Sequence, residues 1–158
     1  VIFLRIGDRW GKGKQPSMKN VTIQQGLPEA ARKIREDVFM KEQGFQNEFD
    51  EVDKTAWTLV LYDDGAAAGC CQLILAEGSK AAVIRRVAVQ KAFRGKSYGS
   101  LMLQQAEDWL RQRGARSISL SAQVRVQPFY EQLGFHAVGQ EYLDEYCPHI
   151  KMVKEVQA

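Results

Sequence analysis

Hydrophobic and polar positions follow two different spacings along the chain. In several short runs they alternate, as in strands with one buried face. In others the apolar positions recur every three or four residues, as along one face of a helix. Alternation predicts strands over residues 21–25, 55–62, 66–76, 81–89, 117–122, 135–138 and 149–153. Helical spacing predicts helices over residues 28–44, 98–114 and 126–133.

The order of these elements indicates the fold class. A strand and a helix come first, then a three-strand meander, and then a helix–strand–helix segment with two closing strands. This order predicts an α/β (α+β) fold with a mixed, mostly antiparallel central sheet flanked by helices. No repeat or flexible linker interrupts residues 18–158, so we expect a single domain there. Residues 1–17 are expected to be a leader or upstream extension outside the fold.

Composition and charge narrow the function classes. The chain has 158 residues, of which 45% are hydrophobic, enough for one buried core. The formal net charge is +3, and residues 1–17 carry all of it. The neutral remainder argues against nucleic-acid binding. No apolar run is long enough for a membrane helix, so no membrane partner is expected.

The cysteines bear on compartment and metal binding. Cys70, Cys71 and Cys147 are odd in number and include an adjacent pair, so a disulfide framework is not expected. Reduced thiols indicate a cytoplasmic protein. Two histidines and the absence of a CxxC or CxxH spacing indicate no metal site.

Residues 87–100 carry the chemistry. A strand enters a loop of small residues, and the loop enters a helix. The first N–H groups of a helix lack intrahelical partners and lie at its positive end, where phosphates bind. The segment therefore predicts an anion site, with a solvated basic loop as the alternative. Its small residues are Gly95, Ser97, Gly99 and Ser100, and its adjacent cations are Arg94 and Lys96.

Two other phosphate-binding classes fit this segment poorly. Gly95-Lys96-Ser97 matches the end of a P-loop, but that motif needs a glycine where Gln90 stands. The strand predicted over residues 117–122 also has no aspartate for a metal. A dinucleotide-binding fold would need a different glycine spacing, near the start of the fold.

The motif Arg94-Gly95-Lys96-Ser97-Tyr98-Gly99 resembles the pyrophosphate motif of the GNAT family of N-acetyltransferases, (Q/R)-x-x-G-x-(G/A). Residues 84–89 resemble that family's central strand, and residues 128–135 its later helix–turn segment. Residues 38–43 and 148–152 are further similar to the ElaA-like branch. The resemblance covers residues 18–158. Ser97 departs from it, because the family usually has glycine at that position.

The resemblance implies an enzyme that transfers the acetyl group of acetyl-CoA to a primary amine of a small molecule or peptide, by direct attack on the thioester. The central strand would pair with the pantetheine arm, and an N–H near Val89 would polarise the thioester carbonyl. Gln123 would bind the pantetheine, or else cap the following turn. The residues implied in binding acetyl-CoA are Val87, Ala88, Val89, Arg94, Gly95, Lys96, Ser97, Tyr98, Gly99, Ser100 and Gln123.

Two catalytic roles remain to be filled. Tyr130 resembles the tyrosine that protonates the departing sulfur, although a core aromatic is the alternative. The central strand offers no carboxylate, so we expect the base to be Glu42, with Glu48, Asp50 and His149 as alternatives. Residues 36–53 hold seven acidic residues and one lysine, which indicates either attraction of a cationic amine or a solvated loop.

A second function class stays open at this point. The same fold could serve as a non-catalytic acyl-CoA-binding sensor or interaction module. Edge strands near the C-terminus could also pair with a second copy, so a homodimer is an alternative to a monomer.

Overall fold

The structure is a computed structural model that describes residues 2–5 and 18–157. These residues form two units. The first holds the described residues up to Gln72 together with Arg86–Gln105, and the second holds Leu73–Arg85 together with the described residues from Ala106 on. The assignment of residues 18–158 to one domain stays a prediction. Of the expected leader, only Ile2–Arg5 are described, and the rest lies outside the described residues.

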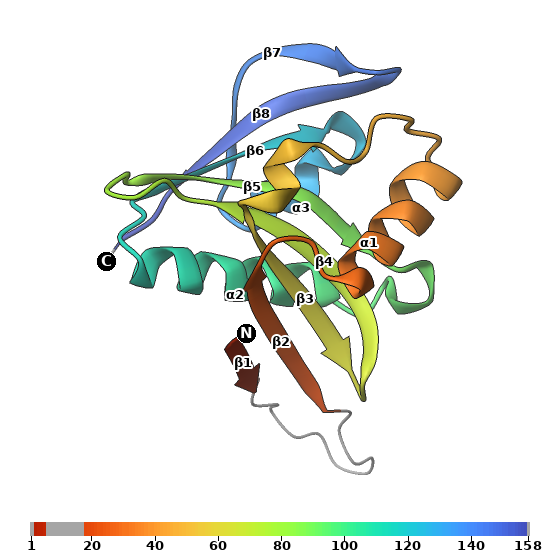
Figure 1. Cartoon of the computed structure of the whole chain (residues 1–158). Coiled ribbons are helices and arrows are strands. Elements are labelled where there is room, and N and C mark those ends of the chain that lie inside the picture. Colours follow the sequence, from red (N-terminus) through yellow and green to blue (C-terminus); the bar gives the residue numbers. More distant parts are fainter. Residues whose placement is uncertain (1, 6–17, 158) are drawn as a thin grey trace. The chain divides into compact units, whose positions relative to one another are not determined.

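Four strands organise the first unit. β1 (Ile2–Arg5) pairs antiparallel with β2 (Lys19–Gln25), and β2 pairs antiparallel with β3 (Trp57–Asp63). Figure 1 shows these three strands side by side. A turn at Asp64 and Gly65, both with positive φ, leads to β4 (Ala66–Ile74), which neighbours β3. Apolar side chains of β2 and β3 are fully buried, among them Val21, Ile23, Leu59 and Leu61.

The helical segment of the first unit changes its winding halfway. The predicted helix over residues 28–44 is confirmed over Glu29–Glu42, but the sequence did not indicate the winding of its second half. α1 (Glu29–Arg35) is an α-helix, but the next seven residues form the π-helix η1 (Glu36–Glu42). The N–H of Gln43 donates to the carbonyl of Val38 at 3.1 Å, which is the i to i−5 pattern of a π-helix. A short helix, η2 (Glu51–Lys54), follows before β3.

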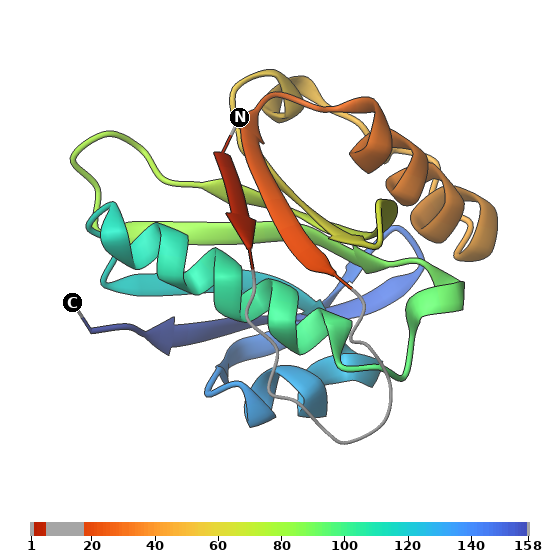
Figure 2. The ribbon, with the colours of Figure 1, turned by 90° about the horizontal axis from the view of Figure 1, so that it is seen from below.

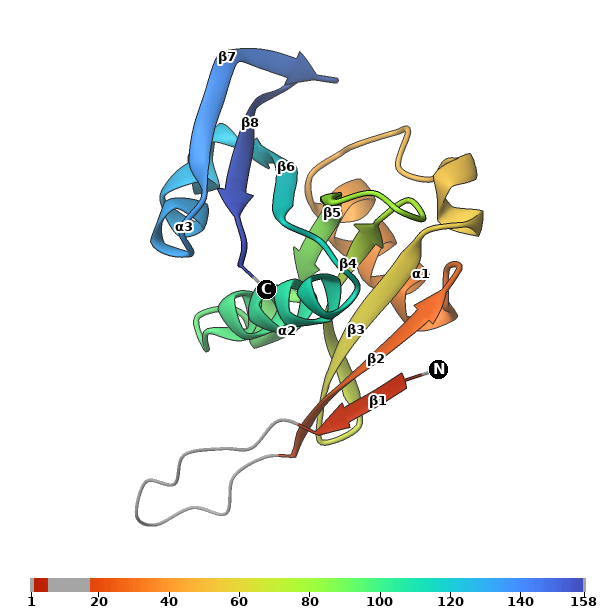
Figure 3. The ribbon, with the colours of Figure 1, turned by 90° about the vertical axis from the view of Figure 1, so that its left-hand side faces the viewer.

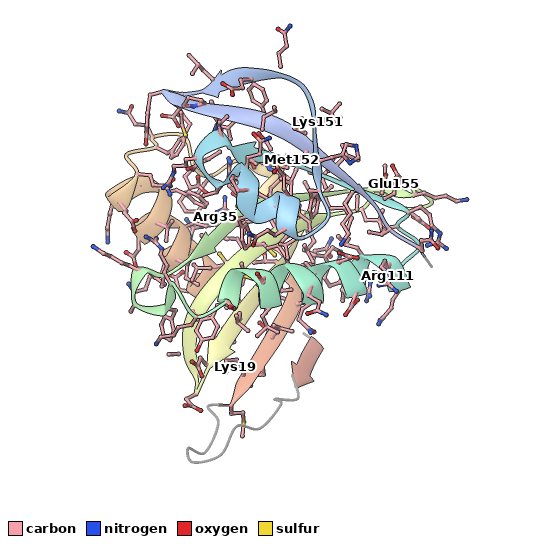
Figure 4. The ribbon with its side chains drawn as sticks, turned by 180° about the vertical axis from the view of Figure 1, so that it is seen from behind. Lys19, Arg35, Arg111, Lys151, Met152 and Glu155 are labelled. Carbon is pink, nitrogen blue, oxygen red and sulfur yellow. The ribbon has the colours of Figure 1, made fainter. Side chains whose placement is uncertain are left out.

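The second unit is built on the start of β5 (Ala81–Val89) and on three later strands. β6 (Ser117–Gln123) pairs parallel with β5 over three residues only, Ala81–Val83 with Ser117–Ser119. β8 (Cys147–Glu155) is antiparallel to β6 and to β7 (His136–Asp144). Figure 3 shows β6, β7 and β8 with the short helix α3 (Gln127–Gln132). Figure 4 labels Lys151, Met152 and Glu155 along β8.

The strand directions confirm the predicted mixed, mostly antiparallel sheet. The strand predicted over residues 149–153 is longer than expected: β8 already begins with Cys147 and Pro148. A tight turn at Glu145, with φ of +52°, brings them opposite β7. The β6 ladder begins one residue later, at His149, so the N–H that Pro148 lacks is not needed there.

Candidate functional site

The predicted pyrophosphate loop lies between β5 and α2 (Tyr98–Gln112), in the first unit. Figure 2 shows the chain leaving β5, turning through η3 (Lys91–Phe93) and entering α2. The N–H of Gln90 donates to the carbonyl of Ala68 at 2.8 Å, which anchors the end of β5 to β4. The N–H of Leu101 donates to Ser97 at 3.1 Å. The N–H groups of Gly99 and Ser100 therefore precede the helical ladder, at the positive end of a 15-residue helix.

The backbone of the loop has the alternation that suits an anion. Gly95 and Ser97 have φ of +76° and +63°, and Lys96 between them does not have positive φ. Anion-binding concavities of successive N–H groups combine right- and left-handed residues, and Gly95 and Ser97 supply the left-handed members of such a pattern. Ser97 adopts this positive φ although it has a side chain, whereas glycine would take it without strain. The N–H of Arg94 itself donates to the carbonyl of Lys91 at 3.3 Å.

Tyr98 fixes the start of α2 through its side chain. The side chain is buried, and its hydroxyl donates to the Asp63 carboxylate at the end of β3. Its ring lies 5.9 Å from that of Phe93, and the Lys19 ammonium lies 5.6 Å from its centre. The side chain therefore anchors the helix, and its predicted part in phosphate binding would fall to its main chain.

Three predicted site residues meet at Arg94. Its Nη1 donates to Oε2 of Glu42 at 2.5 Å, and its Nη2 donates to Oε1 of Glu42 at 2.8 Å. Its Nε donates to the carbonyl of Val89 at 3.0 Å. Hydrogen bonding to Glu42 raises the pKa of Arg94. The expected base, the expected phosphate ligand and the end of the central strand are therefore joined in one contact.

The central strand has an irregularity that the sequence did not indicate. Arg86, in the middle of β5, has φ of +54°, a strained value for a residue with a side chain. Its Nε lies 3.2 Å from Oε1 of Glu48. Ala88 is buried, while Val87 and Val89 are half-buried. All three lie beyond the ladder with β6, which ends at Val83.

Glu48 belongs to a buried group of charges in the first unit. Its Oε1 accepts a hydrogen bond from Nε of Arg35 at 2.8 Å, and Arg35 Nη1 donates to Asp53 at 2.7 Å. Gln72 also donates to Asp53, at 2.8 Å. Burial raises the pKa of Glu48, although Arg86 and Arg35 oppose it. Burial also acts to raise the pKa of Asp53, but hydrogen bonds from Arg35 and the backbone outweigh it and the net shift is downward.

Other acidic side chains of residues 36–53 also have partners within the chain. Asp37 lies 2.8 Å from the ammonium of Lys33 and 3.2 Å from that of Lys41. Asp50 caps η2 by accepting from the N–H of Val52 at 3.1 Å. Glu51 pairs with Lys54 at 2.7 Å. This pairing favours a structural role for the acidic segment over attraction of a cationic amine.

Tyr130 lies in α3, in the second unit. It is buried, with ring centres of Phe129 and Phe135 at 5.0 and 6.0 Å in edge-to-face contact. This packing suits a core aromatic, and the role as acid stays a prediction. Gln123, at the end of β6, accepts a hydrogen bond from Nε of Arg125 at 2.8 Å. Both predicted roles of Gln123 stay predictions.

His149 is fixed in the second unit by its neighbours on β7 and β8. Its Nδ1 lies 2.9 Å from the carbonyl oxygen of Cys147. Because a carbonyl only accepts, Nδ1 carries a proton. The ring of Tyr142 stacks on it with centres 6.1 Å apart, and the hydroxyl of Tyr142 is hydrogen-bonded to Ser121.

The thiols have the character of buried structural groups. Cys70, Cys71 and Cys147 are free and buried. Burial raises the pKa of Cys70 to about 12, and it also raises the pKa values of Cys71 and Cys147. Within residues 2–5 and 18–157 no three His, Cys, Asp or Glu side chains gather in a way that could hold a metal ion. None of the helices described there is long and apolar enough to cross a membrane.

Comparison with known proteins identifies the family. Residues 22–135 match the model of the Acetyltransferase (GNAT) family. The chain is 26% identical to the uncharacterized protein YyaT of Bacillus subtilis over 145 residues, which are 89% of this chain and 96% of YyaT. It is 37% identical to protein ElaA of Escherichia coli over 75 residues, 47% of this chain and 49% of ElaA.

Solved structures share the fold of this chain. An acyl-CoA N-acyltransferase from Pseudomonas aeruginosa aligns with a TM-score of 0.74 and 26% identity, over 86% of this chain and 99% of that one. The crystal structure of Escherichia coli ElaA aligns with a TM-score of 0.75 and 24% identity, over 85% and 99% of the two chains. The predicted acyltransferase fold is confirmed, and the chain belongs to the Acetyltransferase (GNAT) family.

Proposed function

We propose that this protein is an acetyl-CoA-dependent N-acetyltransferase whose acceptor is a primary amine of a small molecule or a peptide. Members of the GNAT family bind acetyl-CoA or CoA and act on amine acceptors. The observation that carries the proposal for this chain is the loop between β5 and α2. There, positive φ at Gly95 and Ser97 is combined with the N-terminus of a long helix.

The residues of this loop fit a diphosphate. A diphosphate needs several donors at close range, and the glycines allow main chain to approach it. The Glu42 carboxylate beside the loop is paired with the Arg94 guanidinium. Lys91 and Lys96 add exposed positive charge beside the loop. The site residues Arg94–Ser100 are therefore proposed to bind the pyrophosphate of CoA.

The main chain of β5 would serve the rest of the donor. Beyond Val83 the strand is outside its ladder with β6, and we assign Val87, Ala88 and Val89 to the pantetheine arm. An N–H donor near Val89 would stabilise the negative charge that develops on the thioester oxygen. Gln123 is assigned to the pantetheine amides.

The reaction needs one base and one acid. The amine nitrogen attacks the thioester carbon, the C–S bond breaks, and the thiolate takes a proton. We assign that proton to the hydroxyl of Tyr130. The proton lost by the amine goes to Glu42. Since both oxygens of Glu42 accept from Arg94, transfer through a water is the more consistent route.

A non-catalytic acyl-CoA-binding sensor is the second candidate. Two observations favour it: Tyr130 is packed among aromatic rings, and Glu42 is engaged by Arg94. Both groups assigned to chemistry thus have structural partners. A sensor would bind CoA without releasing it from acetyl-CoA in the presence of any amine.

We place the protein in the cytoplasm, since a reducing compartment suits three free cysteines. For a homodimer, the edge strand β7, in which all nine residues are exposed, is the proposed pairing surface.

A thiol-release screen of amines with acetyl-CoA tests the function. At least one amine should release CoA, and Tyr130→Phe should lower kcat roughly a hundredfold while leaving CoA affinity within about twofold. Tyr142→Phe, an exposed tyrosine in the same unit, is the matched control and should retain activity. CoA binding without release for any amine would support the sensor instead. An unchanged kcat in Tyr130→Phe would contradict the proposal that Tyr130 protonates the departing thiolate.

A further inference from the structure

The π-helix η1 is joined to the pyrophosphate loop at two points. Near its start, the Asp37 carboxylate accepts a hydrogen bond from Nε2 of Gln90 at 3.0 Å. At its last residue, the Glu42 carboxylate accepts two hydrogen bonds from Arg94. Gln90 and Arg94 lie directly before and after η3, the first turn of the loop. We call the contacts Asp37–Gln90 and Glu42–Arg94 the two ties.

Both ties depend on the π winding. Asp37 and Glu42 are five residues apart. In an α-helix, with 3.6 residues per turn, residues five apart point about 140° away from each other. In a π-helix the i to i+5 hydrogen bond stacks such residues one turn apart on the same face. The winding of η1 is therefore what lets both carboxylates reach one loop.

The two ties hold the loop and still leave hydrogen-bond donors of Arg94 for a phosphate. A guanidinium has five N–H donors in a fixed plane. Arg94 uses three of them, one to Val89 and two to Glu42. Two N–H donors of Arg94 remain for an anion while the tie is intact. Its side chain is 39% exposed, so an anion in solution can reach it.

We propose that Asp37 and Glu42, presented by the π-helix, are positioning residues for the donor diphosphate. They hold Gln90 and Arg94 and so keep the loop in its binding conformation before CoA arrives. This gives Glu42 a role through Arg94, whether or not it also accepts a proton. The inference rests on the proposed function, because it takes the loop to be the site of the CoA diphosphate.

A double-mutant cycle measured by calorimetry with CoA tests the proposal. Glu42→Ala should weaken CoA binding about three- to tenfold, the range for a partly exposed ion pair that fixes a ligand-binding side chain. When Arg94 is already alanine, the further change Glu42→Ala should weaken CoA binding by less than about twofold. Glu42→Gln, which keeps one acceptor oxygen, should fall between wild type and Glu42→Ala. Full additivity of the two alanine variants, or unchanged affinity in Glu42→Ala, would overturn the proposal.

Hydrogen exchange of the ligand-free protein separates this proposal from the proposed function. Glu42→Ala and Gln90→Ala should each speed amide exchange in residues 91–97, by about threefold or more, because the loop loses a tie. Lys33→Ala is the control, since it removes an ion pair of Asp37 within the helix and leaves the tie to Gln90. If the wild type fails to bind CoA but amide exchange in the two variants speeds up as stated, the proposed function is contradicted and the two ties are supported. Unchanged exchange in both variants would overturn the ties whatever CoA does.

Discussion

Arg35 and Glu48, thirteen residues apart, form an ion pair that is shut away from solvent. Their side chains are 2% and 3% exposed, and Nε lies 2.8 Å from Oε1. The same carboxylate oxygen lies 3.2 Å from Nε of Arg86, at the residue of β5 with positive φ. The pair therefore connects α1, the segment after the π-helix and the middle of the central strand.

Removal of Arg35 should cost much of the stability of the fold. Arg35→Met would remove the buried ion-pair partner that Glu48 and Asp53 share, and breaking a buried pair in this way costs about 3–5 kcal/mol. Urea denaturation would measure the loss. Arg32→Met is the matched control on the same helix. Arg32 and Arg35 both lie over the Phe49 ring, but the Arg32 side chain is 44% exposed. Loss of Arg32 should therefore cost about 1 kcal/mol of stability or less. Equal losses in the two variants would contradict this account.

The stability contributed by Asp37 should depend on pH. Hydrogen bonds from Lys33, Gln90 and Lys41 hold the pKa of Asp37 well below its usual value. Because the unfolded chain takes up that proton near pH 3.9, the contribution is complete above about pH 5 and is lost as the pH falls further. The stability difference between wild type and Asp37→Asn should therefore shrink from pH 6 to pH 3, as measured by urea denaturation. A difference that stays constant or grows toward pH 3 would be the opposite result.

Ser97 should tolerate glycine better than a branched side chain. Its φ of +63° costs a residue with a side chain about 1–2 kcal/mol, and glycine avoids that cost. Glycine also increases the conformational entropy of the unfolded chain, which offsets part of this stabilisation. The stability of Ser97→Gly should therefore lie within about 1 kcal/mol of that of the wild type. Ser97→Val should be destabilised by more than that and should bind CoA more weakly. Thermal unfolding with and without CoA measures both effects. A valine variant as stable as wild type would count against strain at this residue.

Gly69 should be sensitive because it lies against the central strand. A Cβ there would lie 2.8 Å from the carbonyl oxygen of Ala88 and 3.3 Å from Sδ of Met102. Gly69→Ala should therefore destabilise the protein by about 1–3 kcal/mol and weaken CoA binding, since β5 must shift beside Val87 and Val89. Gly78→Ala is the control. A Cβ at residue 78 would meet no other atom, but the backbone there has positive φ. Gly78→Ala should therefore cost about 1 kcal/mol of stability without affecting CoA binding.

Local patterns predicted most of the strands. β5 was predicted over 81–89 and has those bounds, because alternation and the flanking turn residues agree there. α2 was likewise recognised from its apolar stripe. The π winding of Glu36–Glu42 was missed, because these residues also suit an α-helix and no local pattern marks the change of winding.

The candidate site was predictable only in part. The loop from Arg94 to Ser100 could be recognised from its glycines and cations. The positive φ of Arg86 could not, since no glycine marks it and its partner Glu48 lies 38 residues earlier in the sequence. The pairing of Arg94 with Glu42 spans 52 residues and involves two side chains whose types are common on any surface. Long-range pairing of this kind leaves no local signal.

Calorimetric titration of CoA into wild type and Gly99→Asp tests the diphosphate site most directly. An aspartate in the first turn suits the helix itself, so the variant should fold, but its charge should repel the diphosphate. Gln104→Asp, on an exposed position of the same helix, adds the same charge further from the loop. We predict saturable one-site binding by wild type and Gln104→Asp, and a loss of about tenfold or more in Gly99→Asp. No binding by wild type, or equal binding by wild type and Gly99→Asp, would contradict the site.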